Sequence, residues 1–219
     1  MNLSKVTLPT YSKTEEIINA VSHGVGVLVG IFAFIFFLLK SAETNKLIGG
    51  IIFSVSVVVL YTCSTLYHSV TDTTAKKILR LIDHSSIFIL ITGTSTALTV
   101  ICVFPHSPVF AAVMSAVSIT LSVIGTALTV IDQEKYKKAQ LILYLVVGWI
   151  SAVLIYPIYK YCDNAMTIIL IAAAGGIVYT VGTVFYKLGK KKKYFHSIFH
   201  FFVLAGTLIH LWGFYIVMA

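Results

Sequence analysis

The chain alternates between long apolar segments and short polar connections. Seven segments are mostly apolar and about 20 residues long, at residues 17–39, 47–68, 81–103, 108–130, 140–159, 165–187 and 194–217. A helix of about 20 apolar residues crosses the roughly 30 Å of hydrocarbon in a bilayer. The apolar residues run continuously rather than alternating with polar ones, which favours helices over the strands of a membrane barrel. The pattern therefore predicts an all-α, polytopic (multi-pass) protein of the cell membrane with seven transmembrane helices.

Composition supports this prediction and excludes other classes. Of the 219 residues, 58% are hydrophobic and only 11% are charged, whereas a soluble domain carries about 25% charged residues. Residues 17–219 are therefore predicted to form a single seven-helix transmembrane domain, with no separate soluble domain. Residues 1–16 are polar and are predicted to be a short cytoplasmic segment rather than a cleaved signal peptide. Despite the net charge of +8, no nucleic-acid partner is expected.

Basic residues are distributed unequally between the two sides of the predicted bundle. Thirteen of the 16 lysines and arginines lie at the N-terminus or in the connections after the second, fourth and sixth segments. The other side has only Lys40, Lys46 and Lys160. The positive-inside rule then predicts a cytoplasmic N-terminus and an external C-terminus. Four lysines at 190–193 are expected to contact anionic lipid head groups at the cytoplasmic face. The sequence gives no oligomeric state.

Ionisable residues within the apolar segments are the candidates for chemistry, because such residues are costly in a membrane and usually functional. Asp83 is the only acidic residue predicted to lie well inside a segment. Histidines His196 and His200 are four residues apart, so both project from one face of a helix. With His68 from the second segment, they would offer three imidazoles to one metal ion. Three histidines and an open fourth position are typical of a catalytic Zn²⁺ site.

Two further residues would complete a catalytic zinc centre. Zinc lowers the pKa of a bound water to about 7, and Asp83 is predicted to hold or deprotonate that water. Ser64 lies four residues before His68, where it would hydrogen-bond the water or orient a carbonyl group. Two other histidines in the same leaflet, His23 and His84, are predicted to be interfacial residues or to support the ligands.

Four short motifs at these positions resemble the hemolysin III family, the bacterial branch of the progestin and adipoQ receptor (PAQR) family. The motifs are Glu16-x2-Asn19-x3-His23-x2-Gly26, Ser64-x3-His68, Asp83-His84, and His196-x3-His200 followed by His210. The resemblance extends over all seven segments. It implies zinc near the cytoplasmic face, with His68, His196 and His200 as ligands and with Ser64 and Asp83 beside a zinc-associated water. Asn19 and His23 match the family pattern but are not assigned to the metal.

The resemblance implies several functions, between which the sequence does not decide. Relatives are regarded as ceramidase-like, which implies a zinc-dependent intramembrane hydrolase of a lipid amide or ester, with membrane lipids as partners and substrate. The family name implies a membrane-damaging, pore-forming hemolysin (cytolysin). The receptor branch implies a receptor-like protein in which zinc is structural. A transporter or proton relay would need a polar path through the outer leaflet, for which His106 and His210 are weak evidence.

Overall fold

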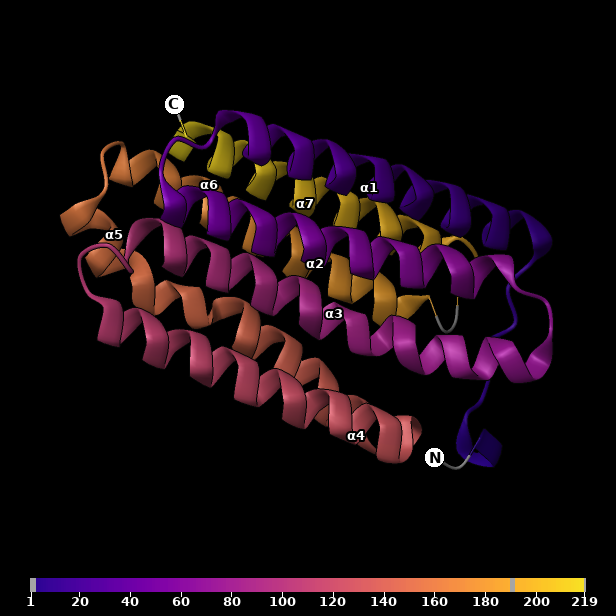
Figure 1. Cartoon of the computed structure of the whole chain (residues 1–219). Helices are drawn as coiled ribbons and strands as arrows, with labels where there is room; N and C mark the ends of the chain where they lie inside the picture. The colour runs from indigo at the N-terminus through magenta and orange to yellow at the C-terminus, as the bar shows by residue number, and fades with distance from the viewer. Residues whose placement is uncertain (1–2, 190–191, 219) are drawn as a thin grey trace.

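The computed structural model describes residues 3–189 and 192–218, and the regular structure within them is helical. The helices lie side by side in one elongated bundle, with the N-terminus and the C-terminus at opposite ends (Figure 1). The long and short helices are α1 (Lys13–Lys40), α2 (Thr44–Ser69), α3 (Thr73–Cys102), α4 (Pro108–Trp149), α5 (Ile155–Tyr161), α6 (Ala165–Leu188) and α7 (Phe195–Met218). Two short 3-10 helices are η1 (Leu3–Lys5) and η2 (Ile150–Leu154).

Six helical stretches of the described residues are long and apolar enough to cross a membrane. This result confirms the prediction of a helical, multi-pass membrane protein. Five of the stretches are single helices, and the sixth covers the 54 residues Pro108–Tyr161. A continuous helix of that length would extend about 80 Å, more than twice the thickness of the hydrocarbon core.

The long stretch is divided because its backbone is not helical at Asp132, where φ is −164° and ψ is 91°. Before Asp132 the chain runs back along α3, and after it the chain returns (Figure 1). On the return, the Tyr144 hydroxyl donates to the His84 carbonyl at 2.7 Å. Further on, Cys162 Sγ lies 3.6 Å from the Cys102 carbonyl at the other end of α3. The two parts thus match segments 108–130 and 140–159, although seven crossings stay a prediction.

Some helix boundaries differ from the prediction for identifiable reasons. Helix α3 begins at Thr73 rather than at residue 81, because the Asp72 side chain caps it by accepting the Ala75 N–H at 2.8 Å. Its first turns are polar, so the hydropathy pattern does not include them. Segment 140–159 is not one regular helix, since it contains η2 and then Pro157, which lacks the N–H that a helix interior needs. Of the four lysines at 190–193, the first two lie outside the described residues.

Small residues hold the central helices close together, as transmembrane packing requires. Gly26 of α1 faces the ring of Tyr61 in α2, and any side chain at this position would overlap that ring. The hydroxyl groups of Thr92 in α3 and Ser122 in α4 are hydrogen-bonded at 2.5 Å. The contact of Gly26 with Tyr61 sets the depth of α2 relative to α1, and hence the position of His68 at the end of α2.

Candidate metal centre

The start of α1 is anchored by a capping box, in which the Ser12 hydroxyl accepts the Glu15 N–H and Glu15 accepts the Ser12 N–H. The remaining carboxylate oxygen of Glu15 accepts the N–H of Tyr194 at 2.7 Å. Tyr194 directly precedes α7 and adopts a left-handed backbone conformation with φ of 64°. The beginnings of α1 and α7 are therefore tied together at the end of the bundle where α2 ends and α3 begins (Figure 1).

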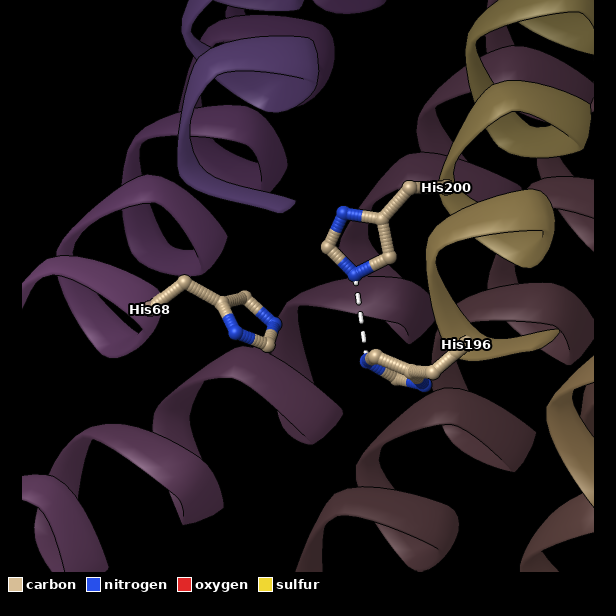
Figure 2. Close-up of side chains that lie close together, drawn as sticks. All are labelled: His68, His196 and His200. Carbon is tan, nitrogen blue, oxygen red and sulfur yellow. Dashed lines mark hydrogen bonds between the residues drawn. The ribbon is translucent and has the colours of Figure 1, made fainter. Parts of the chain in front are cut away.

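Three histidines converge at this end of the bundle. His68 comes from the last turn of α2, and His196 and His200 come from the first two turns of α7. All three are buried, and one nitrogen from each lies within 4.8 Å of the other two. The rings point toward one another from two facing helices, as Figure 2 shows. The structure thus brings together the three residues that the sequence proposed as ligands.

The geometry of this cluster fits a metal ion. The Nε2 atoms of His196 and His200 are 3.1 Å apart, and two nitrogens bound tetrahedrally to zinc at about 2.0–2.1 Å would lie about 3.3 Å apart. Nε2 of His68 is buried and has no hydrogen-bond partner among the described residues. A buried nitrogen without a partner is costly, and a shared cation would satisfy it. The donor set of three imidazoles suits zinc among the common biological cations.

Glu16 orients His68 and is a residue whose role the sequence did not reveal. Its carboxylate lies 2.6 Å from Nδ1 of His68 and 2.8 Å from the ammonium group of Lys76. An imidazole that donates from Nδ1 to a carboxylate presents its Nε2 lone pair to a metal. Only its place in the first motif pointed to Glu16. Asn19, from the same motif, lies 3.5 Å from the same Nδ1 atom.

We expect Glu16→Gln to lower the affinity for zinc by about ten- to a hundredfold, because the neutral amide polarises the His68 ring less strongly than a carboxylate does. The measurement is competition for zinc against a chelator of known affinity. Glu43→Gln is the matched control, since Glu43 is exposed and pairs with Lys46 three residues later, away from the histidines. If the two variants bound zinc with equal affinity, Glu16 would have no role in zinc binding through His68.

Two aromatic rings cover the cluster. His23 of α1 stacks on His200 with 3.7 Å between ring centroids, and neither of its nitrogens has a hydrogen-bond partner among the described residues. It is therefore part of the cluster's packing and not an interfacial residue. Tyr11 stacks on His196 at 4.9 Å. Burial raises the pKa of the Tyr11 phenol, so this group stays protonated.

The segment before α1 folds against the bundle and carries Tyr11 to this position. Lys5 forms an ion pair with Asp132 at 3.2 Å, and the Thr7 hydroxyl donates to Glu134 at 3.0 Å. The Thr7 carbonyl also accepts a hydrogen bond from the guanidinium group of Arg80. Residues 3–12 therefore form a strap over the end of the bundle that holds the histidines. The sequence predicted this segment only as polar.

Asp83 and Ser64 lie near the cluster but are not part of it. Both are buried, and both border one cavity together with His23, His196 and His200. Asp83 lies in the third turn of α3, deeper in the helix than the predicted first turn. The roles of these two residues as partners of a water stay predictions.

The remaining histidines are apart from the three ligand candidates. One carboxylate oxygen of Asp83 is 3.5 Å from Nδ1 of His84. The other ring nitrogen of His84 lies 3.2 Å from the Tyr186 hydroxyl. Nδ1 of His84 donates its hydrogen to the Arg80 carbonyl at 2.9 Å, so the ring lies beside Asp83 and joins α3 to α6. His106 is exposed beyond the end of α3 and stacks on Tyr161 at 4.6 Å, as expected of a loop residue.

A cavity of about 180 Å³ extends from the cluster into the bundle. A single water needs about 10–15 Å³ by the same measure, so this space is much larger than a hydration site. Its walls come mostly from apolar side chains of α3, α6, α7 and the returning part of α4, including Leu90, Leu145, Ile169 and Val203. The fold and this site together define a multi-pass membrane protein with a buried three-histidine cluster at one end of an apolar cavity.

Comparison with known proteins identifies the family. The family description "Haemolysin-III related" matches residues 11–211, and the chain belongs to this family. It is 35% identical over 196 residues to the hemolysin-3 homolog of Bacillus subtilis (strain 168), a match that covers 88% of this chain and 89% of that protein. It is 32% identical over 206 residues to hemolysin-3 of Bacillus cereus, with 93% and 91% covered. A shorter match, 30% identical over 89 residues, covers 41% of this chain and 35% of human monocyte to macrophage differentiation factor.

Proposed function

We propose that the chain is a zinc-dependent hydrolase that cleaves an amide or ester bond of a membrane lipid. One observation carries the proposal: two of the three clustered histidines, His196 and His200, border an apolar cavity together with the buried carboxylate of Asp83. Metal ligands suited to zinc and a group able to accept a proton thus lie next to a space suited to an acyl chain. A purely structural metal would not require the cavity or the carboxylate.

Each residue of the centre has a defined part in this proposal. His68, His196 and His200 hold the zinc, which supplies Lewis acidity and activates water when it is bound. The carboxylate of Asp83 accepts the proton of the attacking water and returns it to the leaving amine or alcohol. The hydroxyl of Ser64 donates a hydrogen bond to the carbonyl oxygen of the substrate, where negative charge develops.

The lipid substrate reaches this centre from the side of the cavity, because residues 3–12 cover the histidine cluster at the end of the bundle. The head group lies at the histidine cluster and the acyl chain lies in the cavity, where its burial provides most of the binding free energy. Tyr11 limits the entry of bulk water at the covered end. Exclusion of water strengthens every polar interaction with the reacting carbonyl group.

The proposal includes seven crossings with the N-terminus in the cytoplasm. Two observations support it: Lys76, Lys77 and Arg80 lie near the start of α3, at the end of the bundle that holds the histidines, and the backbone of the 54-residue stretch is not helical at Asp132. By the positive-inside rule this end faces the cytoplasm. The candidate metal centre is then reached by lipids of the cytoplasmic leaflet.

The direct test is release of free fatty acid from an N-acyl sphingoid lipid or a phospholipid by the purified, reconstituted protein. We expect turnover by the protein as isolated, loss of turnover after treatment with a zinc chelator, and recovery when zinc is restored. The chelated protein is the matched control, because it has the same chain in the same membrane. Turnover that persists unchanged in zinc-free protein would contradict the proposal.

A second candidate function is membrane damage, which the name of the Bacillus cereus relative favours. Leakage of a dye from vesicles that contain only ether lipids, which have no acyl ester or acyl amide bond, separates the two functions. A hydrolase would leave such vesicles intact, whereas a pore would release the dye from them.

A further inference from the structure

His210 lies on α7 ten residues after His200, which corresponds to about 15 Å along the helix axis. It borders the same cavity as His200. An imidazole is thus placed in the wall of the apolar cavity, well away from the candidate metal centre.

The residues around His210 leave space for its ring but form no hydrogen bond with its nitrogens. The ring packs on Tyr179 of α6, with 5.4 Å between centroids. Gly175 makes this position possible, since a Cβ atom there would come within 2.5 Å of Nε2 of His210. Among the described residues, neither ring nitrogen of His210 has a hydrogen-bond partner. A polar group without a partner is costly in the hydrocarbon region and usually marks a function.

Five hydroxyl groups in the cavity wall are satisfied by backbone carbonyls close by in sequence. The hydroxyl groups of Thr94, Ser95 and Thr180 each donate to a carbonyl three or four residues earlier. Ser151 and Thr183 do the same. His210 therefore differs from these neighbours in having hydrogen-bonding capacity that the protein does not use.

Tyr179 adds an acceptor beside His210. The Thr207 hydroxyl donates to the Val203 carbonyl at 3.1 Å, so its only hydrogen is committed. With that hydrogen on Val203, the hydroxyl groups of Tyr61 and Tyr179, at 2.8 and 2.9 Å from the same oxygen, are the donors to Thr207. The phenolic oxygen of Tyr179, which also borders the cavity, keeps lone pairs that can accept a hydrogen bond.

We propose that His210 and Tyr179 form a polar subsite that binds a hydroxyl group midway along the acyl chain of a lipid in the cavity. A hydroxyl group can both donate and accept, so it pairs with either tautomer of the imidazole and with the phenolic oxygen. An unsubstituted chain would fill the same space but leave His210 unpaired. The inference deepens the proposed function by naming the class of acyl chain, and it relies on that function only for the position of the lipid head group.

The test is binding of ricinoleic acid and oleic acid, which differ only in a mid-chain hydroxyl group, measured by displacement of a fluorescent fatty acid from the purified protein. We expect ricinoleic acid to bind about tenfold more tightly, the effect of one net hydrogen bond in an apolar site. His210→Phe should remove this preference, so that the two acids bind this variant with equal affinity. Trp212→Phe is the matched control, because Trp212 is exposed on the same helix, and it should keep the preference.

Equal affinities for the two acids in the unmodified protein would overturn the subsite, as would a preference that survives His210→Phe. If His210→Phe does not fold, Tyr179→Phe should reduce the preference by about two- to threefold, through loss of the second, weaker partner. The binding assay is also run on chelated protein. If chelated protein still binds ricinoleic acid more tightly than oleic acid, the subsite is supported even when no hydrolysis is found. If the protein hydrolyses lipids but binds the two acids equally, the subsite is wrong and the proposed function stands.

Discussion

Replacing His200 with alanine is expected to reduce bound zinc from about one ion per chain to less than about a tenth. The imidazoles of His196 and His200 lie on one helix face with their Nε2 atoms 3.1 Å apart, so a metal at this position needs both. Loss of a group that only orients a ligand costs about ten- to a hundredfold in metal affinity, and loss of a ligand should cost more. The measurement is elemental analysis of the purified variant.

The matched control for this variant is His106→Ala. His106 is exposed beyond the end of α3 that lies away from the histidine cluster, and it stacks on Tyr161, so its removal should leave the zinc content unchanged. Size-exclusion chromatography of both variants shows whether each is folded. A folded His200→Ala protein that keeps a full equivalent of zinc would show that His200 is not a ligand.

Asp83→Asn is expected to lower the rate of lipid hydrolysis by about a hundred- to ten-thousandfold, the usual contribution of a general base, while zinc content stays close to one. The amide has the shape of the carboxylate but cannot accept a proton from water. The measurement is kcat for fatty-acid release, with zinc content determined on the same sample. This pairing distinguishes a catalytic metal from a structural one, since a structural metal predicts no loss of any activity on Asp83→Asn.

Asp72→Asn is the matched control, because it removes a negative charge from the same end of α3 as Asp83→Asn does. Asp72 is exposed and caps α3, and asparagine is an equally good capping residue. The rate should therefore stay within about twofold of the unmodified protein, since helix capping is preserved. If Asp83→Asn and Asp72→Asn both retain the full rate, Asp83 has no part in the chemistry.

The sequence predicted the helical, multi-pass fold because apolar segments of membrane-spanning length leave few alternatives. The convergence of His68, His196 and His200 was also predictable. Two of them share one helix face by spacing alone, and the third had to lie at the same depth once the direction of each segment was assigned. The order and length of the segments brought these three histidines together, and the resemblance to the hemolysin III family singled them out from His23 and His84 in the same leaflet.

Contacts made by polar segments outside the apolar pattern could not be predicted in this way. The strap of residues 3–12 is held by Lys5 and Thr7, whose partners lie more than a hundred residues away at Asp132 and Glu134. The pairing of Glu16 with His68 depends on the rotation of α1 about its axis, which hydropathy does not specify. The position of His210 in the cavity wall likewise depends on how α6 and α7 pack, because Gly175 leaves the space that its ring occupies.

X-ray absorption at the zinc edge, on protein purified without added metal or chelator, tests the central claim most directly. The proposed site predicts a strong zinc signal with three imidazole nitrogens at about 2.0–2.1 Å and one further light ligand. Absence of zinc, or a first shell dominated by sulfur at about 2.3 Å, would contradict the assignment of His68, His196 and His200 as its ligands.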